Sequence, residues 1–239
     1  MIIMLLQCIV FDLDDTLYLE RDYVRSGFRA VGEWAKTALG IPDFGHRAWR
    51  LFEGGTRGAT FQTVLAECGR KPEPELVERM VNIYRCHSPE IELLPDALRC
   101  LSELKGKALL AMVTDGPAEC QKAKCASLGV RDFFDIVVCT GEWGEEFYKP
   151  HLRAFEFIQK QLGQEDRIFS YVADNPLKDF HAPIALGWDT VRVRRHGGLH
   201  FAKEGLKNFT AKFETPNLWN FVELSNSFGA QSAAAERTP

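Results

Sequence analysis

The sequence predicts an α/β fold: a parallel sheet flanked by helices, with an all-helical segment inserted after the first strand. Three observations support this prediction. Short apolar runs alternate with helical patterns over the second half of the chain, which favours βαβ units and a parallel sheet. The stretch between residues 20 and 92 shows helical spacing and no convincing strand. Several apolar runs also end in acidic or hydroxyl residues, at the edge where open α/β sheets place their ligands.

The first strand is expected at residues 8–11, an apolar run that leads into the acidic sequence Asp12-Leu13-Asp14-Asp15-Thr16. Carboxylates that crowd together repel one another and need a cation, a proton or a basic partner. We therefore expect a metal ion or a charged ligand at this position. An acidic turn after an edge strand is the alternative interpretation.

Helical patterns follow this first motif. The longest covers 22–39, where Gly40-Ile41-Pro42 is expected to end the helix, and shorter ones cover 44–53, 60–68 and 73–86. Strands are then expected at 108–113, 136–139, 168–173 and 190–194, and helices at 95–104, 117–128, 150–162, 176–186 and 218–224. The predicted domains are a core of residues 1–20 and 92–224, a helical domain of 21–91, and a disordered tail of 225–239.

Two further motifs follow strands or open helices. The expected strand near residue 110 ends in the hydroxyl residue Thr114, and Asp115 and Gly116 form the turn after it. Lys149 precedes Pro150, which suits the first turn of a helix, so we expect Lys149 at the mouth of that helix. Taken singly, each is also explained by an ordinary strand and turn, or by a surface lysine beside a helix start.

The fourth motif completes a set. The expected strand at 168–173 ends in Asp174, and Asp179 follows five residues later. In this order, the four motifs resemble the complete signature of the haloacid dehalogenase-like (HAD) superfamily across roughly residues 8–195. The resemblance implies a Rossmann-like core and places the chain with the subclass that carries a helical cap between its first two motifs. One departure is Ala173, where the family usually has Gly; we expect modest strain there and no loss of the site.

The resemblance also implies catalytic roles. Asp12 would attack phosphorus and form an aspartyl-phosphate. Asp14 would give a proton to the leaving oxygen and then take one from the hydrolytic water. Thr114 and Lys149 would bind the phosphoryl oxygens. The substrate-binding set implied by the motifs also includes Asp115 and Gly116.

A magnesium ion is the cofactor that the resemblance implies. Mg²⁺ prefers oxygen ligands, commonly one or two carboxylates with water and phosphate. Asp12 and Asp174 would supply carboxylates, and Asp14 would supply its backbone carbonyl. Asp179 would hold the water shell of the metal or orient Lys149.

The function expected from these residues is a Mg²⁺-dependent phosphatase acting on a small phosphorylated metabolite. Dehalogenases of the superfamily lack an acid at the position of Asp14, because a departing halide needs no proton. A sugar phosphomutase, or a catalytically weak binding or regulatory module on the same fold, remains an alternative. In the expected cap, residues 54–61 carry Arg57, which would bind a phosphate or carboxylate of the substrate. A flexible turn with a solvated arginine is the other interpretation of that segment.

Composition narrows the remaining possibilities. The net charge of −4 provides no basic field for nucleic acid or an anionic membrane. Seven scattered cysteines without a CxxC pair suggest a reducing compartment, and no segment approaches the ~20 apolar residues of a membrane span, so a cytoplasmic protein is expected. The oligomeric state is not indicated. One local basic cluster is expected to be a solvated loop and comprises Arg192, Arg194, Arg195 and His196.

Overall fold

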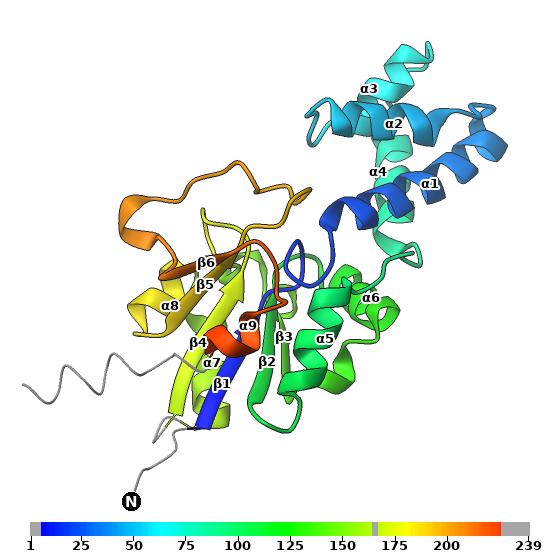
Figure 1. Ribbon diagram of the computed structural model, residues 1–239. Coiled ribbons are helices and arrows are strands. Elements are labelled where there is room, and N and C mark those ends of the chain that lie inside the picture. The colour runs from blue at the N-terminus through cyan, green and yellow to red at the C-terminus, as the bar shows by residue number, and fades with distance from the viewer. Residues whose placement is uncertain (1–5, 164–166, 226–239) are drawn as a thin grey trace, which may run out of the picture. The chain divides into compact units, whose positions relative to one another are not determined.

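The computed structural model describes residues 6–163 and 167–225 (Figure 1). The chain forms two compact units. The core unit consists of the chain up to Glu20 together with the chain from Glu92 onward, and the helical unit is Arg21–Ile91. No helix in the described part of the chain is long and apolar enough to cross a bilayer.

A six-stranded parallel sheet forms the centre of the core unit, which confirms the predicted fold class. The strands are β1 (Leu6–Phe11), β2 (Leu109–Thr114), β3 (Ile136–Cys139), β4 (Arg167–Ala173), β5 (Asp189–Val193) and β6 (Phe213–Thr215). They lie in the order β3-β2-β1-β4-β5-β6, so the direction of winding reverses at β1. Open α/β sheets bind their ligands at such a reversal, beyond the carboxyl ends of the strands.

Helices cover both faces of the sheet (Figure 1). They are α5 (Pro95–Leu104), α6 (Ala118–Leu128), α7 (Arg153–Leu162), α8 (His181–Ala185) and α9 (Phe221–Ser225), with short 3₁₀ helices at Arg131–Phe133, Thr140–Glu142, Glu145–Phe147 and Lys207–Phe209. Side chains alternate between the two faces along a strand. Val10 accordingly packs in one cluster with Phe155 of α7, whereas Phe11 contacts Phe134 and Phe221 on the opposite face.

Two helices begin later than the sequence predicts. Pro150 does not open a helix: the peptide bond before it is cis, and α7 begins at Arg153. The helix expected at 176–186 is confined to α8, because a turn occupies its first part. In that turn the Asn175 N–H donates to Asp179 Oδ2 at 2.9 Å, and the Asp179 N–H donates to the Asn175 carbonyl at 3.1 Å. The second bond has the spacing of a single helical turn, and the regular helix α8 begins only at His181.

The C-terminal part of the core unit contains a strand that the sequence pattern did not indicate. β6 is three residues long and pairs with β5, with Val193 opposite Thr215. A strand this short and half exposed carries too little alternation to be recognised. The final helix was expected at 218–224 but spans Phe221–Ser225, so Ser225 belongs to a helix and not to the tail. Residues 226–239 of the predicted tail lie outside the described residues.

The helical unit contains no strand within the described residues, as predicted. Its helices are α1 (Glu20–Leu39), α2 (Phe44–Glu53), α3 (Thr60–Glu67) and α4 (Pro74–Cys86). The interior is aromatic: the Phe28 ring lies 5.9 Å from the Phe61 ring and 5.7 Å from the Tyr84 ring. The backbones of α1 and α2 approach closely, because a Cβ at Gly32 would lie 2.9 Å from the Gly45 nitrogen. Glycine is required where two helices come this near.

The basic cluster around residue 195 is not the solvated loop that the sequence predicted. Arg195 is buried, and it donates from Nε to the Thr16 carbonyl and from Nη1 to Asp96 Oδ2, both at 2.8 Å. Arg192 is also buried and donates to the carbonyl of Asp174. Arg192 therefore attaches β5 to the residue that follows β4, and Arg195 attaches the segment after β5 to the turn that follows β1. Sequence periodicity contains no information about such long-range partners.

Replacing Arg195 by Met should lower the free energy of unfolding by about 3–5 kcal/mol, because Asp96 then remains buried without its cation. Urea unfolding of the purified variant measures this change. Arg194→Met is the matched control: its side chain is 28% exposed and pairs with exposed Glu204, so we expect little change in the free energy of unfolding. Equal losses in the two variants would contradict the structural role of Arg195.

Candidate active site

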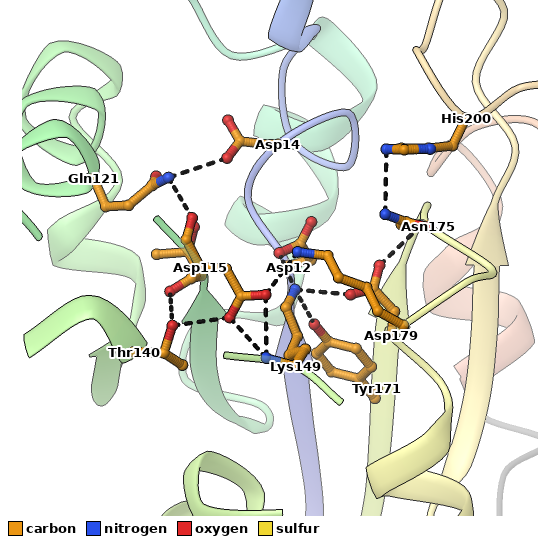
Figure 2. Close-up of polar contacts among 12 residues, drawn as sticks. Asp12, Asp14, Asp115, Gln121, Thr140, Lys149, Tyr171, Asn175, Asp179 and His200 are labelled. Carbon is orange, nitrogen blue, oxygen red and sulfur yellow. Dashed lines mark hydrogen bonds and ion pairs between the residues drawn. The ribbon is translucent and has the colours of Figure 1, made fainter. Parts of the chain in front are cut away.

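The site is assembled by the register of three neighbouring strands. Phe11 of β1 pairs with Met112 of β2 and with Val172 of β4, so the residues that follow these strands come to the same edge. Asp12 directly follows β1, and its N–H donates to the Val172 carbonyl at 2.9 Å. Asp174 directly follows β4. Figure 2 shows the polar side chains that gather at this edge.

One buried lysine is shared among several acids. Lys149 Nζ lies 2.6 Å from Asp12 Oδ1, 2.8 Å from Asp179 Oδ1 and 3.0 Å from the Tyr171 hydroxyl (Figure 2). Asp12, Asp174 and Asp179 each contribute a carboxylate oxygen to a group whose oxygens lie within 4.8 Å of one another. This acidic group thus contains three carboxylates around one ammonium, which leaves negative charge to be compensated.

Burial and mutual repulsion shift the pKa values of this acidic group. Burial raises the pKa of Asp12 to about 7, although Lys149 draws it down. Burial, followed by the charges of Asp179 and Asp12, raises the pKa of Asp174 well above its usual value. Burial alone would lower the pKa of Lys149, but Asp12 and Asp179 outweigh it and raise that pKa well above its usual value. The lysine therefore stays charged.

A divalent cation fits the acidic group. Asp174 Oδ2 is buried and has no hydrogen-bond partner among the described residues. A buried carboxylate oxygen without a donor is costly unless a proton or a cation compensates it. Oxygen-only donors at this spacing suit a hard ion such as Mg²⁺.

Asp14 is held apart from the acidic group. Its Oδ1 accepts from Lys124 Nζ at 2.7 Å and from the Tyr18 hydroxyl, and its Oδ2 accepts from Gln121 Nε2 at 3.3 Å. Burial would raise the pKa of Asp14, but the charge and hydrogen bond of Lys124, with the Tyr18 hydrogen bond, outweigh it and lower that pKa. The Asp14 side chain is therefore directed toward α6, as Figure 2 shows for its contact with Gln121.

Asp115 organises the loops around the site. Its Oδ1 accepts from the Thr140 hydroxyl at 2.8 Å and from the Lys149 N–H at 3.1 Å, and its Oδ2 accepts from Lys178 Nζ at 2.6 Å. Burial would raise the pKa of Asp115, but Lys149 and Lys178 outweigh it and lower that pKa. Both carboxylate oxygens are thus engaged within the protein. The expected role of Asp115 in binding substrate stays a prediction.

Thr114 and Gly116 flank Asp115 at the end of β2. The Thr114 hydroxyl is buried and has no hydrogen-bond partner among the described residues, which leaves it available to a ligand. Gly116 has a φ of 128°, a backbone conformation that side chains other than glycine rarely adopt. Their binding roles also stay predictions.

A comparison with protein families identifies the fold. A family model for haloacid dehalogenase-like hydrolases matches residues 6–185. The chain belongs to the haloacid dehalogenase-like hydrolase family. The resemblance that the four sequence motifs indicated is thereby confirmed.

Relatives within the family include characterised phosphatases. The glyceraldehyde 3-phosphate phosphatase of Methanocaldococcus jannaschii is 33% identical over 196 residues, which cover 77% of this chain and 83% of the relative. The protein of the same name from Methanopyrus kandleri is 31% identical over 80% of this chain and 85% of its own. The HAD-hydrolase YfnB of Bacillus subtilis, crystallised with magnesium, has a TM-score of 0.68 and 19% identity over 92% of this chain and 99% of its own. At this identity, the structural likeness shows the fold alone.

The departure from the HAD pattern at Ala173 causes no backbone strain. Ala173 is the last residue of β4, is fully buried, and does not have a positive φ. The strain lies instead at Asp15, whose φ is 54°. Its carboxylate accepts from the N–H groups of Glu20 at 2.8 Å and Leu199 at 2.6 Å, which holds the turn after the first motif.

Arg57 makes its contacts inside the helical unit. Its guanidinium donates to the carbonyls of Phe52 at 2.7 Å and Thr56 at 2.9 Å, and it lies 4.0 Å above the centre of the Phe52 ring. These contacts hold the turn after α2. They leave the side chain exposed, so its predicted role toward substrate is not decided by them.

Several residues of the site were not singled out from the sequence. They are Tyr18, Gln121, Lys124, Tyr171 and Lys178. The one available signal was in α6, where Gln121 and Lys124 are three residues apart and share a helix face with the apolar Cys125 and Leu128. Polar residues on a buried helix face need hydrogen-bond partners, but the sequence does not indicate that Asp14 is the partner of these two.

The raised pKa of Asp12 predicts how stability depends on pH. Folded Asp12 retains its proton up to about pH 7, whereas the unfolded chain loses it near pH 4, so the parent protein loses stability as pH rises through this window. Asp12→Asn lacks this titration. The free energy of unfolding of the variant should therefore rise relative to that of the parent, by up to about 1.4 kcal/mol for each pH unit in this window.

Urea unfolding in the presence of a chelator, from about pH 5 to about pH 7, measures this difference. Asp132→Asn is a suitable control, because Asp132 is exposed and should follow the parent at every pH. Parallel curves for the parent and Asp12→Asn would show that burial does not raise the pKa of Asp12.

Proposed function

We propose that this protein is a Mg²⁺-dependent phosphatase that hydrolyses a small phosphorylated metabolite through an aspartyl-phosphate. The observation that carries this proposal is the pairing of Asp12 with buried Lys149. Asp174 adds a buried carboxylate oxygen, Oδ2, that accepts no hydrogen bond from the described residues. That arrangement provides a carboxylate nucleophile, a fixed positive charge and acidic ligands in one place. Similarity to phosphatases over about three quarters of the chain supports the same reaction class.

The proposed reaction has two steps, both with Asp12 and Asp14. Asp12 attacks phosphorus and the bond from phosphorus to the leaving oxygen breaks. Asp14 would take up a proton when the anionic phosphate binds beside it, and it gives that proton to the leaving oxygen. Asp14 then takes a proton from water, the water oxygen attacks phosphorus, and the bond to Asp12 breaks to release inorganic phosphate. Lys149 and the free hydroxyl of Thr114 would bind the phosphoryl oxygens throughout.

Mg²⁺ would be held by the carboxylates of Asp12 and Asp174 and by the backbone carbonyl of Asp14. Bound there, it would offset the repulsion between these carboxylates and the phosphate dianion. Asp179 would orient Lys149, which it contacts at 2.8 Å. The Asp14 side chain is bound to α6 and lies outside the acidic group, so the proposal assigns its carboxylate to proton transfer and not to metal binding.

The helical unit is proposed to act as the cap that selects the substrate, with Arg57 as one of its binding residues. Glyceraldehyde 3-phosphate, the substrate named for two relatives, is the first compound to test. A cytoplasmic location is supported by seven scattered cysteines without a CxxC pair. No basic surface field favours nucleic acid or an anionic membrane as a partner.

Phosphate release from p-nitrophenyl phosphate and from a panel of small phosphorylated metabolites tests the proposal. Release that requires Mg²⁺ would support a phosphatase. Conversion of one hexose phosphate into another without net release would favour the phosphomutase alternative. Absence of both reactions in the folded, Mg²⁺-loaded protein would leave the catalytically weak binding module as the better interpretation.

Asp12→Asn should lower kcat by at least about 10⁴-fold, because the amide cannot form the covalent intermediate. Single-turnover assays with Mg²⁺ measure the loss, and urea unfolding shows whether the variant is folded. Asp132→Asn, an exposed acid far from the strand ends in sequence, should keep parental kcat. Substantial turnover by folded Asp12→Asn would assign the nucleophile elsewhere.

Chelation should abolish phosphate release, and added Mg²⁺ should restore it. Asp174→Asn should raise the Mg²⁺ concentration for half-maximal activity by about 10-fold or more, because it removes a charged ligand. The shift in melting temperature on adding Mg²⁺ should shrink in the same variant, which is a readout independent of activity. An unchanged Mg²⁺ titration would exclude Asp174 as a ligand.

Arg57→Ala should lower kcat/KM for the physiological substrate by about 10-fold while changing turnover of p-nitrophenyl phosphate by less than about twofold. The reason is that the aryl phosphate lacks the groups that a cap residue would bind. Arg50→Ala is the matched control, because Arg50 is 72% exposed on the same part of the helical unit. Parental kinetics on both substrates would assign Arg57 to the turn after α2.

A further inference from the structure

Lys124 is a second buried lysine in the described part of the core unit, distinct from Lys149. It lies on α6, its side chain is 5% exposed, and its Nζ is 2.7 Å from Asp14 Oδ1. A lysine is almost never this buried unless an anion accompanies it. The neighbouring Lys122, two residues away on α6, shows the ordinary case: it is 52% exposed and pairs with surface glutamates. The burial of Lys124 therefore requires a specific explanation.

Two further donors fix the same carboxylate. The Tyr18 hydroxyl donates to Oδ1 of Asp14, and Gln121 Nε2 donates to Oδ2 at 3.3 Å. Gln121 Nε2 also donates to the Asp115 carbonyl at 2.6 Å, so it connects the first and second strand ends (Figure 2). Asp14 is consequently held on both oxygens by side chains from two parts of the core unit.

The two oxygens of Asp14 are held unequally. Oδ1 accepts a short charged hydrogen bond from Lys124 and a further bond from Tyr18, whereas Oδ2 accepts the long 3.3 Å bond that Gln121 shares with Asp115. Charge-assisted bonds at short distance are roughly twice as strong as neutral ones. Oδ2 is therefore the oxygen that can exchange a partner while Oδ1 keeps its hydrogen bond from Lys124.

We propose that Lys124 is the positioning residue for Asp14: it anchors Oδ1, so that Oδ2 is presented for proton exchange with the leaving group. This inference rests on the proposed phosphatase reaction and assigns Lys124 no contact with substrate or metal. Holding a general acid in one orientation raises the reaction rate, because misplacement by about 1 Å can lower that rate by on the order of 10²-fold. Gln121 limits the swing of Oδ2 without binding it strongly.

A double-mutant cycle tests the proposal on the full chain with Mg²⁺. The four proteins are the parent, Lys124→Met, Asp14→Asn, and the variant with both changes. Each is assayed on an alkyl phosphate, glycerol 2-phosphate, and on an activated aryl phosphate, p-nitrophenyl phosphate. The alkyl oxygen is a poor leaving group that needs the proton of Asp14, whereas the aryl oxygen needs it much less.

Lys124→Met should lower kcat on the alkyl phosphate by about 10–100-fold and on the aryl phosphate by less than about threefold, with little change in KM. In the Asp14→Asn background, the same substitution should change kcat by less than about twofold, because there is no acid left to position. The Mg²⁺ concentration for half-maximal activity should match that of the parent. Lys122→Met, the exposed neighbour, should leave all of these values unchanged.

Two more variants keep the test decisive if Lys124→Met folds poorly. Lys124→Arg keeps the cation and should retain most of the activity on the alkyl phosphate, whereas Lys124→Gln keeps a hydrogen-bond donor but not the charge and should not. The Asp14→Asn, Lys124→Met variant removes both charges together and is expected to fold better than Lys124→Met alone.

The outcomes separate the two proposals. A folded, Mg²⁺-loaded parent that releases no phosphate from any substrate overturns the proposed function and this inference with it. If the parent is active and Lys124→Met lowers kcat equally on both substrates, the inference alone is overturned. An equal loss in the Asp14→Asn background also overturns it, since that result would mean a structural role for Lys124.

Discussion

The excess of buried carboxylates at the ends of β1 and β4 is the constraint on which the rest of the core unit depends. Asp12, Asp174 and Asp179 meet around a single ammonium group, that of Lys149. Such a group is unstable as three free anions, so it must bind a proton or a cation. Burying these carboxylates lowers the stability of the fold, and the proposed reaction uses the same carboxylates as nucleophile and metal ligands.

Much of the surrounding structure holds these charges in place. Asp115 binds the backbone N–H of Lys149, which fixes the lysine against the acids. Arg192 of β5 donates to the carbonyl of Asp174, and Arg195, just after β5, donates to the carbonyl of Thr16. These links bring distant parts of the chain to one sheet edge. Asp14 lies there in a separate environment, bound by Lys124, Tyr18 and Gln121. The two neighbouring acids therefore have different surroundings: Asp12 lies against Lys149 in the acidic group, whereas Asp14 is bound by Lys124.

The sequence predicted the strands and the long helices well, because each carries its own periodic pattern. The predicted element bounds were wrong where side-chain hydrogen bonds shape a turn or where an element is too short to show a periodic pattern. The turn at Asn175 and Asp179 displaced the start of α8, and the three-residue β6 was too short to recognise. Arg195 was misjudged for a different reason: a basic residue in a polar segment looks solvated until its partner Asp96, far away in the sequence, is known.

What the sequence alone determined is the inventory of the site: apolar strands that end in Asp12, Thr114 and Asp174, with Lys149 between them in chain order. Strand length and alternation are local properties, so the residues of each strand are enough to locate its carboxyl end. The tertiary structure decided which charges are paired. Lys124 and Lys122 are both lysines of α6, yet one is buried against Asp14 and the other is exposed to surface glutamates. That difference arises from the packing of α6 beside the first strand end, a long-range arrangement that no local pattern encodes.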